Sequence, residues 1–188
     1  MKKRIVVGAS GASGIPLLCT TLKLIRDSNL YESYLILTES AKITIEMESD
    51  LSLEEINALA DHTLDIKNIA ALPASGTFKC EGMIIVPCSM KTLAGIFSGY
   101  TDNLLLRAAD VTIKEQRKLV LATRESPLST IHLRNLYELS KVPGIQIIPP
   151  MLTYYHKPKT VEDLTYHMAA KLVEPFGIEA RGYRRWNG

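Results

Sequence analysis

Short apolar runs alternate along the chain with longer stretches in which apolar residues recur every three or four positions. The short runs are rich in β-branched residues and predict strands at Arg4–Val7, Tyr34–Leu37, Met83–Val86, Lys118–Leu121 and Ile145–Ile148. The longer stretches predict helices at Ile15–Arg26, Ala41–Glu48, Leu53–Ala60, Met90–Phe97, Leu104–Lys114, Thr130–Ser140 and Val161–Val173. Apolar strands separated by helices are typical of a parallel sheet that is covered on both faces. The pattern therefore predicts an α/β fold, a single Rossmann-like (flavodoxin-like) three-layer domain over residues 1–188 with a short C-terminal arm at about 179–188.

The composition argues against several classes of protein. The net charge is only +2, with 22 basic and 20 acidic residues interspersed, so no basic stripe for nucleic acid stands out. No apolar stretch approaches the roughly 20 residues of a membrane helix, and the run Ile5–Val7 is too short for a signal-peptide core. Cys19, Cys80 and Cys88 are odd in number and lack Cys-x-x-Cys spacing, which argues against a disulfide framework or a zinc site. We expect a cytoplasmic protein that binds neither membrane nor nucleic acid.

In this architecture, ligands bind beyond the carboxyl ends of the strands. The residues that follow the five predicted strands are Ser10–Ser13, Thr38, Pro87–Thr92, Arg124 with Glu125, and Pro149, Pro150 and Tyr154–His156. They combine hydroxyls, cations and aromatic rings with the start of a predicted helix at Ser89. Such a set suits a phosphorylated, partly aromatic ligand.

The first of these loops, VVGASGASG, has three glycines at intervals of three. It is not the G-x-G-x-x-G loop of dinucleotide enzymes, and it is not a P-loop, because no Gly-Lys-Ser/Thr follows. An NAD site would also need an acid at the end of the second strand, where Thr38 stands instead. Taken alone, the loop is equally compatible with a tight turn in which Ser10 or Ser13 caps the first helix.

Charged residues mark the second half of the chain. Arg107, Asp110 and Lys114 have helical spacing and share one face, either as a salt-bridged surface or as part of a site. Arg124 and Glu125 stand at the mouth of a buried strand, where an acid is costly unless it is paired or used.

Several longer strings are more specific. SGASG, PCSMKTLAGI, DNLLLRAADV, LVLATRESPLSTIHLRN and PPMLTYYHKPKTVEDL resemble the UbiX family of flavin prenyltransferases, and the similarity runs from Arg4 to the closing RRWNG. The resemblance implies a homododecamer, with active sites shared between subunits, that binds FMN and dimethylallyl phosphate. It also implies transfer of the dimethylallyl group to N5 and C6 of reduced FMN. The product, prenylated FMN, would serve a UbiD-type aromatic acid decarboxylase.

Carried over position by position, the resemblance implies three groups of site residues. The FMN-binding group is Gly11, Ala12, Ser13, Thr38, Ser89, Met90, Lys91, Thr92 and Arg124. The group that holds dimethylallyl phosphate is Arg107, Tyr155, Lys171 and Trp186, and the catalytic group is Ser13, Glu48, Lys114 and Glu125. The sequence departs from the family pattern in two places. Ile15–Leu18 stands where the family commonly has a small residue followed by Tyr-Gly or a similar pair. Lys171 stands where several members carry Arg, so it would meet a phosphate as a point charge.

The residue types also suit this chemistry by themselves. An allylic phosphate ionises when cations and donors stabilise the departing group. The side chains that could supply them are Lys114, Arg124, Tyr155 and Lys171. The C6 proton needs an acceptor, either Glu48 or the released phosphate. Asp110 and Asp163 are isolated in the sequence, so we expect no metal.

Two other functions remain open. One is an FMN-dependent aromatic (phenolic) acid decarboxylase subunit, and the other is a non-catalytic FMN carrier for a partner decarboxylase. A carrier would leave four residues without a function, namely Lys114, Glu125, Tyr155 and Lys171. A decarboxylase of the cysteinyl-peptide kind uses a histidine after the first helix, and the four histidines of this chain, His62, His132, His156 and His167, stand elsewhere.

Overall fold

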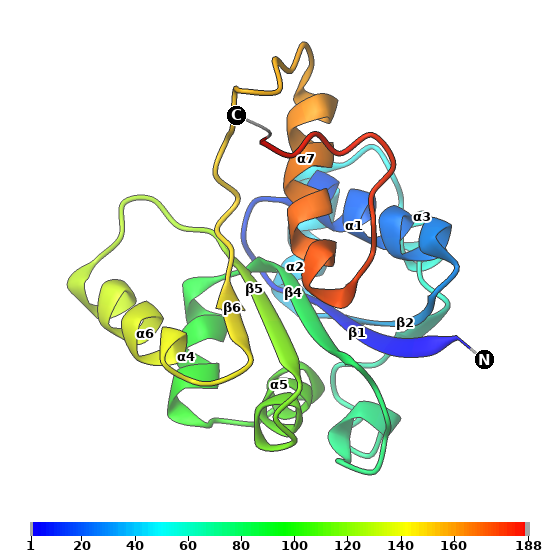
Figure 1. Cartoon of the computed structure of the whole chain (residues 1–188). Coiled ribbons are helices and arrows are strands. Elements are labelled where there is room, and N and C mark those ends of the chain that lie inside the picture. The colour runs from blue at the N-terminus through cyan, green and yellow to red at the C-terminus, as the bar shows by residue number, and fades with distance from the viewer. Residues whose placement is uncertain (1, 187–188) are drawn as a thin grey trace.

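The computed structural model describes residues 2–186, and within them six parallel strands form one sheet (Figure 1). The strands are β1 (Lys3–Ala9), β2 (Tyr31–Leu37), β3 (His62–Leu64), β4 (Gly82–Cys88), β5 (Lys118–Thr123) and β6 (Ile145–Ile147). Their order across the sheet is β3-β2-β1-β4-β5-β6. Without β3 this is the flavodoxin order, and with β3 it is the order of classical dinucleotide-binding folds. The predicted α/β class is confirmed.

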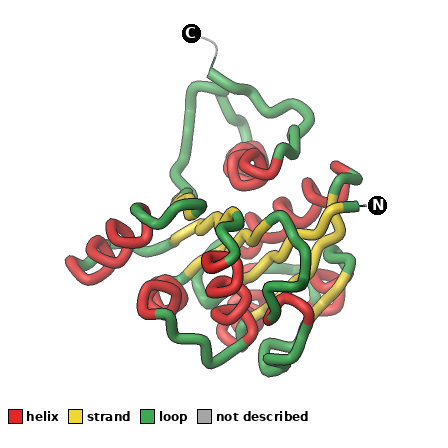
Figure 2. Tube along the Cα trace, turned by 60° about the horizontal axis from the view of Figure 1, so that its bottom comes forward, coloured by secondary structure: helices red, strands yellow, loops and turns green. Residues whose placement is uncertain are grey.

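The helices cover both faces of the sheet, as Figure 2 shows. They are α1 (Ile15–Ser28), α2 (Glu39–Glu48), α3 (Leu53–Asn57), α4 (Met90–Ser98), α5 (Leu104–Lys114), α6 (Thr130–Ser140) and α7 (Val161–Val173), with 3₁₀ turns η1 (Leu72–Ala74) and η2 (Glu174–Phe176). One core lies between the sheet and α1, α2, α3 and α7, and the other between the sheet and α4, α5 and α6.

Strand β1 illustrates why the strands read as continuous apolar runs. Ile5 and Val7 pack into the first core, whereas Val6 between them packs into the second, and all three are at most 1% exposed. Burial of each such side chain is worth about 1.5–3 kcal/mol. A polar residue at any of the three positions would therefore face an apolar layer.

The predicted elements are confirmed, with ends shifted by a few residues. The exception is β3, an edge strand that the apolar pattern does not predict, because it has three residues and two of them, His62 and Thr63, are exposed. The helix predicted at Leu53–Ala60 ends at Asn57, although Ser52 and Glu55 form the capping box that its sequence indicates. No helix among residues 2–186 is long and apolar enough to cross a membrane.

The described part of the C-terminal arm folds back along α7 (Figure 1). The Tyr166 hydroxyl donates to the Arg181 carbonyl at 2.7 Å, and the Arg185 guanidinium pairs with Glu174 at 3.1 Å. The segment after β6 also runs up beside α7. Both segments therefore meet at the α7 side of the sheet. Residues 187 and 188 of the predicted arm lie outside the described residues.

Candidate functional site

Ser10 joins the loops that follow β1 and β4. Its hydroxyl oxygen accepts a hydrogen bond from the Ser89 N–H at 2.8 Å, and its own backbone N–H donates to the Pro87 carbonyl at 3.0 Å. The side chain is 1% exposed, so it serves as a clamp between the loops and does not cap α1. The clamp brings the predicted FMN-binding residues of both loops to one edge of the sheet.

The glycine loop lies directly against the first turn of α2. A Cβ added to Gly11 would stand 2.4 Å from the Ser40 Cβ, a distance that no side chain tolerates. Gly14 has φ of 140°, a conformation that L side chains rarely adopt. Thr38 is the N-cap of α2, and its hydroxyl accepts from the Ala41 N–H at 3.1 Å. The loop is therefore packed tightly against its neighbours, with Ala12 partly buried and Ser13 exposed.

The start of α4 has the features of an anion site. The Ser89 hydroxyl caps the helix by accepting from the Thr92 N–H at 3.3 Å. The amides of Met90 and Lys91 have no acceptor inside the helix, and they carry the positive end of its dipole. The Arg124 backbone N–H donates to the Cys88 carbonyl at 3.0 Å, which places this exposed arginine beside the same helix start. A phosphate group suits this position.

Glu48, the last residue of α2, binds the start of α1. One of its carboxylate oxygens accepts from the N–H of Gly14 at 2.9 Å and from the N–H of Ile15 at 3.1 Å. Burial alone would raise the pKa of Glu48, but the hydrogen bonds from these amides and from Ser13, with the charge of Arg124, lower it overall. Glu48 is therefore held as a carboxylate that interacts with Ser13 and Arg124.

A second region lies between α1, α7 and the segment after β6. A cavity of about 270 Å³ has apolar walls that include Leu17, Pro149 and Met168, and it also contacts Tyr155 and Lys171. The Lys171 ammonium pairs with Glu174 at 2.6 Å, and this hydrogen bond raises the pKa of Lys171. A small amphiphile with an anionic head matches this lining.

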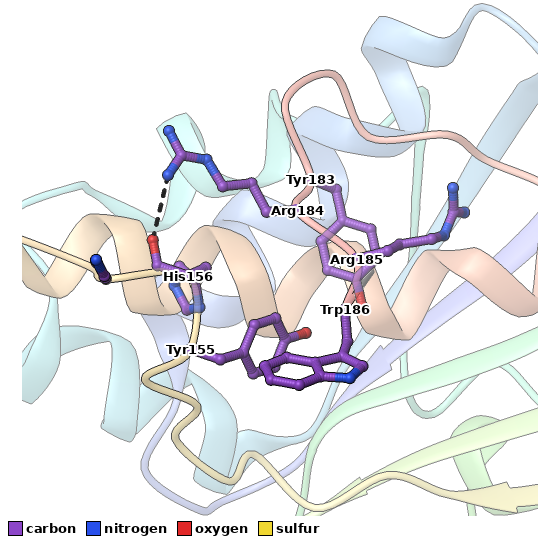
Figure 3. Close-up of a pocket in the computed structure, with 7 residues that line it drawn as sticks. Tyr155, His156, Tyr183, Arg184, Arg185 and Trp186 are labelled. Carbon is purple, nitrogen blue, oxygen red and sulfur yellow. Dashed lines mark hydrogen bonds between the residues drawn. The ribbon is translucent and has the colours of Figure 1, made fainter. Parts of the chain in front are cut away.

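The arm covers the outer side of Tyr155. Figure 3 shows Trp186 lying over Tyr155, and the ring centroids are 5.5 Å apart in an edge-to-face arrangement. Arg184 of the arm donates to the His156 carbonyl at 3.4 Å. A groove of about 720 Å³ runs between these residues, Tyr183 and Arg185. The predicted pair Tyr155 and Trp186 is thus brought together.

Two predicted residues do not reach this edge within one chain. Lys114 ends α5 just before β5 begins, so it lies at the opposite, amino-terminal end of the sheet, where it pairs with Glu115 at 2.7 Å. Arg107 pairs with Asp110 at 2.7 Å and donates to the Ala74 carbonyl in η1. The expectation that Lys114 gathers with Arg124 is therefore wrong for a single chain, because α5 descends from the site edge.

The environment of Glu125 also differs from the one that the sequence predicts. It lies at the rim next to Arg124, but it is exposed, and its carboxylate accepts from the Ser126 N–H at 3.0 Å. The desolvation cost expected for an acid at the mouth of a buried strand does not arise in one chain. No group of three or more His, Cys, Asp or Glu side chains within residues 2–186 could hold a metal ion.

Comparisons with known proteins agree with this geometry. The family model described as Flavoprotein matches residues 1–172. The chain is 48% identical to the flavin prenyltransferase LpdB of Lactiplantibacillus plantarum over 186 residues, which cover 99% of both chains. The chain belongs to the UbiX-like flavin prenyltransferase family. The resemblance drawn from its sequence strings is thereby confirmed.

Two solved structures of the UbiX-like family superpose on nearly the whole chain. A dodecameric FMN-dependent UbiX-like decarboxylase from Escherichia coli O157:H7 is 46% identical with a TM-score of 0.96, over 98% of this chain and 100% of that one. AnUbiX (PadA1), in complex with FMN and dimethylallyl pyrophosphate, is 42% identical with a TM-score of 0.97, over 100% and 99%.

Three residues of this UbiX-like site were not singled out from the sequence as site residues with these roles. They are Ser10 as the clamp, Ser40 as the contact of Gly11, and His167, whose ring nitrogen lies 3.1 Å from the Tyr155 hydroxyl. Their partners are separated from them by 12 to 79 positions, so no local pattern marks them.

Proposed function

We propose that this protein transfers the dimethylallyl group of dimethylallyl phosphate to N5 and C6 of reduced FMN. The observation that carries the proposal is a pair of separate regions with cations and hydrogen-bond donors, one after β4 and β5 and the other after β6 and along α7. One is the start of α4 beside Arg124, and the other is the cavity with Lys171 and Tyr155. Two phosphorylated substrates need two such regions. The name of LpdB supports prenyl transfer to flavin, and the AnUbiX complex with FMN and dimethylallyl pyrophosphate supports a flavin and a dimethylallyl donor as the two ligands.

The residues after β1 and β4 fit FMN. The first-turn amides of α4 and the Arg124 guanidinium suit its phosphate, and the small residues Gly11–Ser13 allow a flat ring to approach the backbone. Reduced FMN supplies the nucleophilic nitrogen and carbon when it is bound. The loop residues hold the flavin, while Ser13 and Glu48 lie at the start of α1, the helix whose Leu17 lines the second cavity.

Lys171 and Tyr155 bind the prenyl phosphate and stabilise the charge that develops as it departs. Glu48 stabilises the positive charge of the allyl group as a carboxylate. Because its pKa is lowered, it is a weak proton acceptor, and the released phosphate is the better acceptor for the C6 proton. Trp186 and the arm exclude water from this region. No metal takes part in this scheme.

We also propose that the chain assembles into a homododecamer whose sites are shared between copies. Arg107 and Lys114, which one chain leaves far from Arg124, would serve the site of a neighbouring copy. The contact face that we propose is the outer side of α6, where Ile131 and Tyr137 are each 63% exposed. This face begins directly after the rim residues Arg124 and Glu125, so a second copy seated there would also cover the site. The UbiX-like relative from Escherichia coli O157:H7 is itself dodecameric, which supports the proposal.

We also propose a domain organisation, a recipient of the product and a cellular location for this protein. Residues 1–188 act as one domain whose C-terminal arm, about 179–188, closes the site. The product is delivered to a UbiD-type decarboxylase. The protein works in the reducing cytoplasm, which the free thiols of Cys19, Cys80 and Cys88 favour.

Anaerobic incubation with reduced FMN and dimethylallyl phosphate, without added metal, tests the reaction. Mass spectrometry of the extracted flavin should detect FMN enlarged by one dimethylallyl unit. Unmodified FMN together with carbon dioxide release from a phenolic acid would instead establish a decarboxylase, the activity for which the Escherichia coli relative is named. Unmodified FMN without carbon dioxide release would point to a carrier.

A further inference from the structure

Tyr155 does not stand alone in the cavity. Its hydroxyl lies 3.1 Å from Nε2 of His167, a side chain of α7 that is only 7% exposed. The His167 ring stacks on His156 with centroids 4.0 Å apart and planes within 3° of parallel, and Tyr183 of the arm covers it at 4.8 Å. The imidazole is therefore fixed in one orientation, with its Nε2 directed at Tyr155.

His167 and Lys171 share one face of α7, because they are four residues apart in the same helix. Both contact the cavity of about 270 Å³, and Tyr155 reaches it from the segment after β6. The helix thus presents a cation and an imidazole to the same cavity, and the imidazole meets the tyrosine hydroxyl there.

The direction of the hydrogen bond follows from the charge of the ligand. Burial lowers the pKa of His167, so at neutral pH the ring is neutral and has one N–H. An unprotonated phosphate oxygen can only accept, so Tyr155 gives its single hydroxyl hydrogen to it. The His167 Nε2–H then donates to the tyrosine oxygen. This tautomer leaves the hydroxyl hydrogen free to point at the ligand.

We propose that His167 is a positioning residue that orients the Tyr155 hydroxyl toward the phosphate of the prenyl donor. The inference rests on the proposed function, because it takes the ligand of Tyr155 to be an allylic phosphate. His167 lines the donor cavity, but its Nε2 bonds the Tyr155 hydroxyl and is assigned no hydrogen bond to the substrate. Its whole effect on the donor passes through Tyr155.

A double-mutant cycle tests this dependence. Dimethylallyl phosphate is titrated calorimetrically into protein loaded with oxidised FMN, so that binding is measured without prenyl transfer. His167→Phe should weaken donor binding roughly two- to tenfold, the range for one neutral hydrogen bond, and leave FMN affinity unchanged. In the Tyr155→Phe background, His167→Phe should have no further effect. His167→Gln, which keeps an N–H donor, should recover part of the loss.

Two controls separate this role from a structural one. His156→Phe keeps the aromatic stack without touching the Tyr155–His167 bond, so it should bind the donor as the parent protein does. Trp186 is the only tryptophan of the chain, and its ring lies 5.5 Å from Tyr155. The fluorescence of Trp186 in FMN-free samples therefore tests whether each variant keeps the structure of the donor site, and it should equal that of the parent protein.

Specific outcomes would overturn the proposal. They are donor binding by His167→Phe equal to that of the parent, an equal loss in the Tyr155→Phe background, or a parallel loss of FMN affinity. If His167→Phe does not fold, the comparison of His167→Gln with His167→Met, with and without Tyr155, decides the same question. If the parent forms prenylated FMN but the effects of His167→Phe and Tyr155→Phe on donor affinity simply add, only this inference is rejected. Coupled binding without prenylated FMN would reject only the proposed reaction.

Discussion

Glu48→Ala should destabilise the fold although Glu48 is only half-buried. Helix α1 begins after Gly14, which has no side chain to cap it, and no acidic residue lies in its first turn. Glu48 supplies the missing acceptor from α2, through bonds of 2.9 and 3.1 Å to the first two amides. The substitution leaves these amides and the positive end of the α1 dipole without a protein partner.

The magnitude follows from the two bonds. A hydrogen bond to a charged group contributes about 1.5–3 kcal/mol, and water can replace part of it at a half-buried site. We expect a loss of about 2 kcal/mol for Glu48→Ala, which lowers Tm by about 4–8 °C in a domain of this size. Glu48→Gln keeps an acceptor oxygen without the charge, so its loss should be about 1 kcal/mol.

Urea unfolding and thermal melts of the FMN-free protein measure these losses. Glu46→Ala is the matched control, because Glu46 is an exposed glutamate two positions earlier in the same helix. Its effect should stay within about 0.5 kcal/mol. If Glu48→Ala has the same Tm and free energy of unfolding as Glu46→Ala, Glu48 does not cap α1.

The pH dependence provides an independent check. The pKa of Glu48 is lowered in the folded protein, so the unfolded chain takes up a proton at a higher pH than the folded one. Its contribution is complete above the unfolded value of about 4.3 and is lost as the pH falls through the folded value. The stability difference between the parent and Glu48→Gln should therefore be constant well above the unfolded value of about 4.3 and should shrink as the pH falls below it. A difference that stays constant below that value would contradict the lowered pKa.

Three further predictions concern the site and the assembly. Gly11→Ala, whose Cβ would stand 2.4 Å from that of Ser40, should cost about 1–3 kcal/mol and weaken FMN binding in flavin fluorescence titrations. Ser40→Gly should restore only part of the binding, because the Ser40 backbone would still lie 3.3 Å from the added Cβ, and a double variant with no recovery at all would refute the side-chain contact. Lys171→Ala should weaken dimethylallyl phosphate binding by about ten- to hundredfold in calorimetry with FMN affinity kept, whereas equal losses of both would place Lys171 outside the donor site. Ile131→Asp, on the exposed face of α6, should reduce the oligomer mass in light scattering without lowering the stability of the subunit, and an unchanged mass would reject that face as the contact.

The sequence by itself determined the layered α/β fold of this protein. Its strands are apolar at successive positions, as at Ile5, Val6 and Val7, because each strand faces two cores, and that pattern is local. Helix ends were also predictable where a single side chain caps them, as Ser52 does with Glu55. The edge strand β3 was not, because its pairing with β2 is set by backbone contact and its side chains are largely exposed.

The site was decided only in part by the sequence. The family resemblance of SGASG and PCSMKTLAGI predicted the FMN-binding loops Gly11–Ser13 and Ser89–Thr92, because the residues of each loop are contiguous in the chain. Contacts between distant segments required the tertiary structure: Glu48 bound to the start of α1, and His167 turned toward Tyr155. The same holds for Lys114, whose spacing along the helix is compatible with a site. Only the direction in which α5 runs under the sheet places it at the opposite end.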